Sequence, residues 1–190
     1  MEPLYSVLIY KDILDQETIQ LIYTYLQKGI KVYFLSGTNK GEVEQAIASH
    51  YGGRRNPLFV AHLEMPPQED FAGDPFFFFD GDIDDPYFYD WIASNSTFNL
   101  QQYEIEHSNP HEHCLVKAGA GTGKTRVMID RLFYLRKTQD NLTFDQMAMV
   151  TFTNESALTM RKRLTQRLQD YFLFTRDETY LSCLKKVSVQ

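Results

Sequence analysis

The 190-residue sequence predicts an α/β protein made of two units, each of which places helices against a parallel sheet. In the first 65 residues, short apolar segments rich in β-forming residues alternate with helix-like segments. From residue 98 onward, an apolar strand leads into a glycine-rich turn and a helix, and the strand-to-helix pattern then repeats. Both patterns are those of parallel sheets flanked by helices.

The charges of the sequence also divide into two parts. Residues 1–110 carry 6 basic and 17 acidic side chains, a net charge of −11, whereas residues 111–190 carry 13 and 8, a net charge of +5. A basic second half could attract a polyanion such as a nucleic acid. A chance asymmetry among solvated faces explains the same numbers equally well, so both interpretations stay open.

The composition excludes several protein classes. With 43% hydrophobic and 23% charged residues, the chain is neither disordered nor a low-complexity scaffold. No apolar run approaches the roughly 20 residues that span a bilayer, and the first residues lack a secretion signal, so we expect no membrane partner. The two cysteines, Cys114 and Cys183, are typical of reduced thiols in a cytoplasmic protein.

Residues 1–65 are predicted to form a small Rossmann-like α/β accessory domain. Asp15 is expected to cap the first helix, whose apolar positions recur every three or four residues, and Gly29 is expected to end it. The β-α-β-α-β order favours a parallel sheet. The predicted strands are residues 6–10, 31–35 and 58–61, and the predicted second helix is residues 42–51.

Residues 66–97 are predicted to form an acidic, aromatic-rich connector, with nine aromatic residues between Phe71 and Trp91. The run Phe76–Phe79 has no alternation, as expected of one fully buried strand. Exposed aromatics in such number would make the chain insoluble, so we expect most of them to pack between the two halves. The alternative is a patch that binds a protein partner, which would give residues 1–97 a docking role.

Residues 98–190 are predicted to form the second unit. Asn154 is expected to cap a long helix whose apolar residues lie on one stripe. The predicted strands are 114–117, 147–152 and a strand beginning at 187, the predicted first helix is 124–137, and the stripe comprises Ala157, Met160, Leu164, Leu168 and Tyr171.

The segment from Ala118 to Thr125, AGAGTGKT, has the pattern of a phosphate-binding loop. Its glycines let backbone N–H groups approach phosphate oxygens, and the helix that follows directs its positive dipole end at the same anion. Lys124 would reach the β- and γ-phosphates of ATP, and the Thr125 hydroxyl would ligate Mg²⁺. The cradle itself would consist of Gly119, Ala120, Gly121, Thr122 and Gly123.

One position departs from the general pattern, which has glycine where this chain has Ala118. Alanine does not easily adopt a positive φ, so we expect the loop to begin with an ordinary backbone conformation there. A glycine-rich turn without a ligand is the alternative, which the Gly-Lys-Thr sequence behind an apolar strand disfavours.

Three segments together resemble the UvrD/Rep-like superfamily-one DNA helicases. AGAGTGKTR at 118–126 resembles motif I of that family, and FNLQQ at 98–102 is similar to its Q motif. TFTNESALTMRKR at 151–163 resembles motif Ia, which touches single-stranded DNA. The resemblance implies that residues 98–190 are the first part of a P-loop, RecA-like motor domain. It also implies that Gln102 reads the adenine edge and that Arg126 lies near the base.

The motif Ia segment also has a direct physical interpretation. Phe152 follows a predicted parallel strand, where open α/β sheets place their ligands, and an aromatic ring there can stack on a base. Thr153 and Asn154 can donate hydrogen bonds to phosphates, and Arg163, with Arg167 on the same flank of the helix, can run beside a nucleic-acid backbone. The alternative makes Phe152 a core residue and the arginines solubilising charges.

Two departures limit what the resemblance implies. Glu155 stands where the family usually has lysine, and a carboxylate there suits the helix dipole but opposes a phosphate. ATP hydrolysis also needs an acidic residue for magnesium and the attacking water, and an arginine for the transition state, which later motifs supply in the family. Because those motifs are absent from the sequence, we expect it to hydrolyse ATP slowly or not at all when alone.

Two functional classes follow. The first is the ATP-binding N-terminal part of a DNA helicase or translocase, with Lys124 and Thr125 as its catalytic residues and without unwinding activity by itself. The second is a non-helicase P-loop NTPase or switch whose N-terminal module binds a protein. Gln102 and the segment from Phe152 to Arg163 favour the first class.

Overall fold

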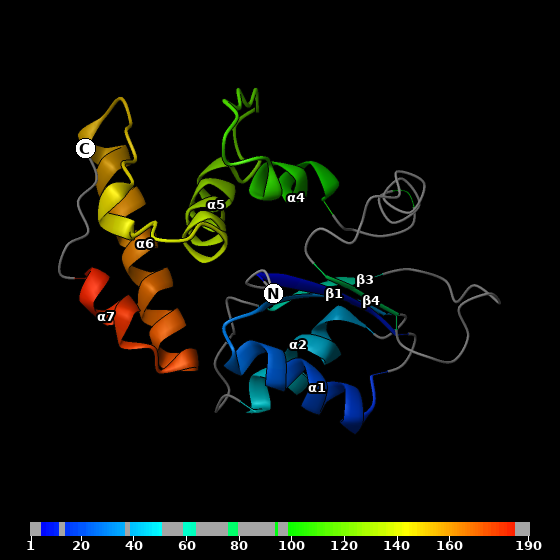
Figure 1. The fold of residues 1–190 in the computed structure, drawn as a ribbon. Helices are drawn as coiled ribbons and strands as arrows, with labels where there is room; N and C mark the ends of the chain where they lie inside the picture. Colours follow the sequence, from blue (N-terminus) through cyan, green and yellow to red (C-terminus); the bar gives the residue numbers. More distant parts are fainter. Residues whose placement is uncertain are drawn as a thin grey trace. The chain divides into compact units, whose positions relative to one another are not determined.

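The computed structural model describes residues 5–11, 14–36, 39–50, 59–63, 76–79, 94 and 99–184. The chain divides into two compact units, an N-terminal unit of Leu4–Asn99 and a C-terminal unit that holds Leu100–Gln190 (Figure 1). The α/β class is confirmed, but all the sheet pairing that the structure describes lies in the N-terminal unit.

The N-terminal unit is built on a four-stranded sheet in the order β3-β2-β1-β4. Strand β1 pairs in parallel with β2, with Val7 opposite Val32, and β2 pairs in parallel with β3. Strand β4 runs antiparallel to β1. The strands are β1 (Ser6–Tyr10), β2 (Lys31–Ser36), β3 (Phe59–Leu63) and β4 (Phe76–Phe79).

The predicted β-α-β-α-β order is therefore observed for the first three strands, and every residue of β1 and β2 is buried. The run of four phenylalanines does form a strand, at the edge of the same sheet. The predicted packing of the aromatic residues between the two halves lies outside the described residues, and the Rossmann-like class of this unit stays a prediction.

Two helices, α1 (Gln16–Gln27) and α2 (Lys40–His50), cover one face of this sheet (Figure 1). Asp15 caps α1 as predicted, because its carboxylate accepts a hydrogen bond from the N–H of Thr18 at 2.8 Å. The hydrogen bond from Lys11 to that carboxylate, helped by the Thr18 N–H, holds the pKa of Asp15 well below its usual range. Gly29, at φ 69°, lies just after the helix in the left-handed conformation that favours glycine.

The C-terminal unit consists of helices throughout its described part. Helix α4 lies beside α5, and α6 lies beside α7 (Figure 1). The elements are α4 (Leu100–His107), α5 (Lys124–Thr138), the short 3₁₀ helix η2 (Phe144–Gln146), α6 (Asn154–Thr175) and α7 (Glu178–Leu184).

Aromatic rings form the centre of this unit. Phe133 of α5 stacks on Tyr171 of α6 with ring centroids 4.3 Å apart, and it meets Phe144 edge-on at 5.1 Å. Tyr180 of α7 lies 5.1 Å from Tyr171, so four elements share one aromatic cluster. Burial raises the pKa of the Tyr171 phenol well above its ordinary value.

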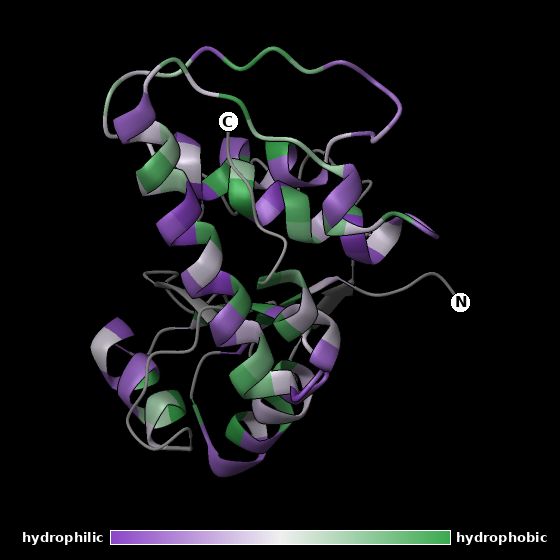
Figure 2. Cartoon of the chain, turned by 90° about the vertical axis from the view of Figure 1, so that its left-hand side faces the viewer, coloured by the Kyte–Doolittle hydropathy of each residue, from purple (hydrophilic) through white to green (hydrophobic). Residues whose placement is uncertain are grey.

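Helix α6 buries four residues of the predicted stripe, Met160, Leu164, Leu168 and Tyr171, while Ala157 is half-buried. Its cap is Thr153 and not Asn154, because the Thr153 hydroxyl accepts a hydrogen bond from the N–H of Ser156 at 3.1 Å. Hydrophobic and hydrophilic residues alternate along the helices, as expected of amphipathic segments (Figure 2). Among the described residues, no helix combines the length and the apolar character that crossing a bilayer needs.

The predicted strands at 114–117 and 147–152 were wrong as paired elements, because neither segment joins a sheet. A strand needs a neighbour to bond its N–H and C=O groups, and two short strands alone are marginal in water. Leu115 and Val150, which a sheet would cover, are 86% and 73% exposed. The strand predicted from residue 187 lies outside the described residues.

Candidate functional site

The phosphate-binding loop is a glycine turn that leads directly into α5. Gly121 and Gly123 have φ of 76° and 83°, values that a side chain would strain. Gly123 is the N-cap of α5, and its carbonyl accepts the first helical hydrogen bond from the N–H of Val127 at 3.1 Å. Ala118 keeps an ordinary φ, as predicted. The loop therefore aims the N-terminal end of a 15-residue helix at its own interior.

Lys124 folds back over this loop. Its ammonium donates a hydrogen bond of 3.0 Å to the carbonyl of Ala118 and a second, short one to the carbonyl of Gly119. The Thr122 hydroxyl donates to the same Gly119 carbonyl at 2.9 Å. The loop carbonyls thus hold the Lys124 ammonium against the loop. Thr125 follows in the first turn of α5.

Gln102 reaches the loop from α4. Its side-chain amide donates a hydrogen bond of 3.0 Å to the carbonyl of Thr122. A Cβ on Gly123 would lie 3.0 Å from the Gln102 Nε2 atom and would push that amide aside, and the φ of 83° independently favours glycine there. The structure therefore brings Gln102 together with the loop, 20 residues away in sequence.

Arg126, predicted to lie near the base, is half-exposed and faces Asp130 one turn later. Its Nε atom lies 3.7 Å from one carboxylate oxygen of Asp130, whose other oxygen accepts a 2.6 Å hydrogen bond from Arg167 of α6. The Asp130 side chain is only 8% exposed, so this pair lies within the unit. Arg167 is consequently engaged with α5, whereas the sequence had placed it beside a nucleic-acid backbone.

The motif Ia residues lie at the turn before α6. The Phe152 ring is fully exposed, with a relative accessibility of 106%, and Asn154 and Arg163 are also exposed. The Thr153 hydroxyl donates to Ser156 Oγ at 2.8 Å, so its single hydrogen is already used by the helix cap. The alternative interpretation of Phe152 as a core residue is wrong, since nothing covers the ring among the described residues.

Sequence reasoning missed two residues of α5, Asp130 and Arg131. The i,i+4 spacing of Arg126 and Asp130 signalled a pair on one helix face. No local pattern signalled the partners on other elements, which are Arg167 for Asp130 and the end of α4 for Arg131.

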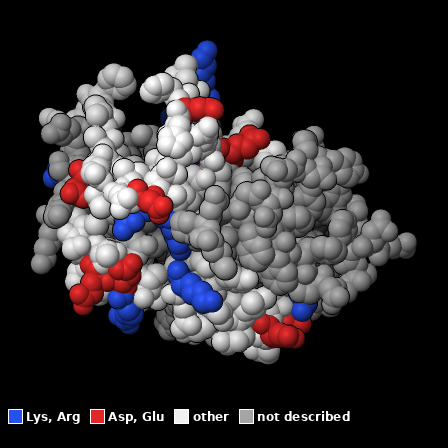
Figure 3. Space-filling model, in the orientation of Figure 1, with Lys and Arg blue, Asp and Glu red and all other residues white. Residues whose placement is uncertain are grey.

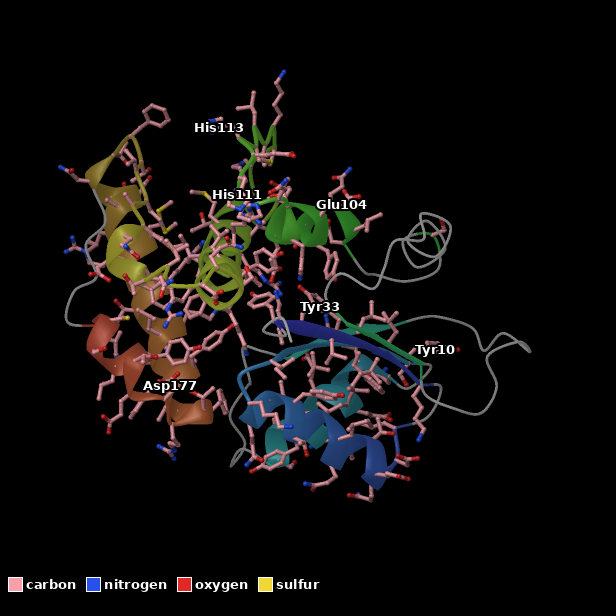
Figure 4. The ribbon with its side chains drawn as sticks, viewed as in Figure 1. Tyr10, Tyr33, Glu104, His111, His113 and Asp177 are labelled. Atoms are coloured by element: carbon pink, nitrogen blue, oxygen red, sulfur yellow. The ribbon has the colours of Figure 1, made fainter. Side chains whose placement is uncertain are left out.

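Two histidines, His111 and His113, lie in the segment between α4 and the loop, close in sequence to Cys114 (Figure 4). Nowhere in the described part of the chain do three His, Cys, Asp or Glu side chains form a group that could hold a metal ion. On the face shown in Figure 3, Lys and Arg side chains lie scattered among Asp and Glu instead of forming one continuous basic patch.

Comparison with known families connects this site to a class of enzymes. Residues 98–188 match the family model of the UvrD/REP helicase N-terminal domain. This match and the relatives below confirm that residues 98–188 resemble the N-terminal part of the UvrD/Rep helicases. No solved structure matches the chain significantly.

Similar proteins include an ATP-dependent helicase/nuclease of Staphylococcus saprophyticus, one of whose subunits is 40% identical over 67 residues. DNA helicase II of Salmonella typhimurium is 47% identical over 57 residues, and the ATP-dependent DNA helicase Rep of Buchnera aphidicola is 47% identical over 55. These alignments cover 35%, 30% and 29% of this chain, and 5%, 8% and 8% of the three relatives. The chain thus matches a small part of much longer proteins.

Proposed function

We propose that residues 98–188 bind ATP with magnesium and touch single-stranded DNA, as the N-terminal part of a helicase or translocase that couples ATP hydrolysis to movement on DNA. The observation that carries this proposal is the loop at 118–125, which opens α5 with Lys124 at its mouth in a segment of the UvrD/REP type.

The loop fits a polyphosphate. The N–H groups of the first turn of α5 have no intrahelical partners, and the positive end of the helix dipole lies at the same place. The Lys124 ammonium is bonded only to neutral carbonyls in the loop contacts described above, and phosphate oxygens are stronger acceptors for it. A triphosphate would therefore exchange places with the carbonyls of Ala118 and Gly119.

The base and the metal would be held by neighbouring groups. We assign Gln102 to the adenine edge, because its amide lies against the loop, and Arg126 to the same side of the nucleotide. The Thr125 hydroxyl is the group that this segment would offer to Mg²⁺, with phosphate oxygens as further ligands. Bound Mg²⁺ would neutralise charge on the β- and γ-phosphates.

Phe152 supports the assignment to single-stranded DNA. A fully exposed aromatic ring offers a face on which a base can stack, and such stacking is worth roughly 1–3 kcal/mol. The first turn of α6 supplies N–H donors for a phosphate next to that ring. Arg163 adds an exposed cation on the same helix.

The activity of the whole protein is part of the proposal. Relatives with these names are helicases, and the matched segment carries the ATP cradle but not the acidic ligand of the later motifs. We therefore expect these 190 residues to bind nucleotide and DNA without unwinding duplexes. The N-terminal unit would serve as a module for a protein partner.

A nucleotide titration tests the cradle. We expect Lys124→Ala to abolish binding of a non-hydrolysable ATP analogue with magnesium, measured by calorimetry, since it removes the only side-chain cation of the loop itself. Lys117→Ala, an exposed lysine just before the loop, is the matched control and should bind as the wild type does. Equal affinity of the Lys124→Ala and Lys117→Ala variants would refute the cradle.

A DNA titration separates the two functional classes. Fluorescence anisotropy with a labelled oligothymidine at low salt should show binding that Phe152→Ala weakens by about tenfold, in line with the loss of one stacked base. Leu158→Ala is the control, because it removes another exposed apolar side chain from α6. No binding by the wild-type chain would favour the nucleotide-dependent switch.

A further inference from the structure

Helix α4 carries Gln102, but it is too short to fix that residue by itself. It has eight residues, and isolated helices of this length are marginal in water. The last carbonyls of any helix also lack intrahelical partners and need other donors. The position of Gln102 therefore depends on what holds the end of α4.

The guanidinium of Arg131, from α5, holds that end. Its Nη1 atom donates to the carbonyl of Glu106 at 2.9 Å and, through a shorter contact, to that of Ser108. Its Nη2 atom reaches the carbonyl of Asn109 at 3.3 Å. One side chain thus binds three carbonyls at the C-terminal end of α4, where the helix dipole also favours a positive charge.

The planar fork of arginine is needed for this contact. Its donors have fixed directions and can serve several acceptors at once, whereas the ammonium of lysine is a compact point charge on a flexible stem. Arg131 also lies over the ring of Tyr134, 5.4 Å from the ring centroid, which keeps the guanidinium in place.

The clamp lies one helical turn from Gln102. Residues 102 and 106 are four apart and share one face of α4, so a shift of the helix end moves the Gln102 amide directly. That amide is held at the loop by its hydrogen bond of 3.0 Å to the carbonyl of Thr122. A small displacement of the helix would break this hydrogen bond.

We propose that Arg131 is a positioning residue for base selection: by clamping the end of α4, it holds Gln102 where the amide reads adenine at the phosphate-binding loop. This inference rests on the proposed function, since it assumes that a nucleotide occupies the loop. It adds a residue that contacts neither the phosphates nor the base.

The readout is the ratio of the affinities for non-hydrolysable ATP and GTP analogues, measured by calorimetry on the 190-residue chain. We expect the wild type to prefer the ATP analogue and Gln102→Ala to lose that preference by about 3- to 10-fold, the value of one hydrogen bond. Arg131→Met should lose it to the same extent, and the double variant should lose no more than either single variant.

Different results would overturn the inference. Arg131→Met with the wild-type ratio would overturn it, as would a double variant in which the two losses multiply, because the residues would then act independently. A wild type without base preference would overturn it as well. If the wild type bound neither analogue, as expected of Lys124→Ala, the proposed function itself would be refuted.

Folding is controlled in two ways. The edge contact of His107 in α4 with Tyr134 in α5, at 4.9 Å between ring centroids, also holds the two helices together, so Arg131→Met should keep its helical circular dichroism. If it does not fold, Arg131→Lys serves instead and should give an intermediate ratio, since one point charge cannot hold three carbonyls. A wild-type ratio in that variant would count against the clamp. Arg136→Met, in the last turn of α5, is the matched control and should keep the wild-type ratio.

Discussion

The two units of the chain are stabilised in different ways. In the N-terminal unit, β1 and β2 lie inside a four-stranded sheet and all their residues are buried. In the C-terminal unit the described elements are helices, held by the cluster around Phe133 and by the ion pair of Asp130 with Arg167. The loop with Lys124 and the ring of Phe152 lie at exposed positions beside that helical core.

The difference shows where binding groups can be placed at low cost. In a strand buried on both faces every side chain packs against the protein and cannot contact a ligand. A helix end and an unpaired turn, by contrast, leave N–H groups and side chains exposed. The features that suit binding in the C-terminal unit are the same ones that contribute little to its stability. Substitutions should therefore separate stability from binding, and the four predictions below run from the largest effect to the smallest.

Two phenylalanines sharpen this comparison most. Phe34 is fully buried in β2, so Phe34→Ala should lower the free energy of unfolding by about 3–5 kcal/mol, measured by chemical denaturation. Phe152→Ala, at a fully exposed ring, should change it by no more than about 0.5 kcal/mol. Similar losses for both variants would mean that Phe152 is covered in solution.

The buried ion pair comes next. Arg167→Met should cost about 3 kcal/mol, because it removes the 2.6 Å hydrogen bond from a charged partner to a carboxylate of 8% exposure. Asp130→Asn combined with Arg167→Met should recover most of the loss, since the double variant buries no charged carboxylate at this position. Thermal unfolding of the wild type, the two single variants and the double variant measures this, and additive losses would contradict a coupled pair.

Alkaline pH tests the aromatic cluster. Burial, helped by the nearby Asp177, raises the pKa of Tyr180 to about 12 from its ordinary value of 10.0. Between these values the unfolded chain loses this proton and the folded chain keeps it, so stability is complete below pH 10 and falls as pH rises towards 12.

Two pKa units at about 1.4 kcal/mol each give at most about 3 kcal/mol, and solvent screening of this half-buried phenol reduces the expected loss to about 2 kcal/mol. Denaturation across the alkaline range should show it, together with a late rise in tyrosinate absorbance. Tyr180→Phe keeps the ring and removes the phenol, so it should flatten the decline. An unchanged pH profile in that variant would place the effect in Tyr171 alone.

The smallest effect concerns the cap of α6. Thr153→Ala removes the hydroxyl that accepts from the Ser156 N–H, and it should cost about 1 kcal/mol. Asn154→Ala, one position later, should cost less, because Thr153 is the cap. Denaturation midpoints of the two variants decide between them, and a larger loss for Asn154→Ala would restore the sequence-based assignment.

Local signals predicted the N-terminal unit well. The cap at Asp15, the stop at Gly29 and the apolar run of β1 all depend on residues within a few positions of one another. The two strands predicted at 114–117 and 147–152 were wrong for the opposite reason. Their apolar composition was read correctly, but a strand exists only if another segment pairs with it, and composition carries no information about that partner.

The candidate site shows the same limit. The glycines, Lys124 and Thr125 could be identified because the loop is one continuous segment with a strict spacing. Arg131 could not, because its partners are carbonyls, which every residue has, more than 20 positions away. The cap at Thr153 was missed by one residue, since threonine and asparagine are both good caps and adjacent choices differ little in energy.

The two hydrogen bonds of Lys124 make nucleotide entry an exchange of acceptors. Because the Lys124 ammonium already donates to two carbonyls, the loop has a defined shape of its own. A phosphate must therefore break these hydrogen bonds before it can pair with the Lys124 ammonium. The measured affinity is then the difference between two sets of bonds. Shortening this lysine would consequently loosen the loop itself as well as weaken its hold on a guest.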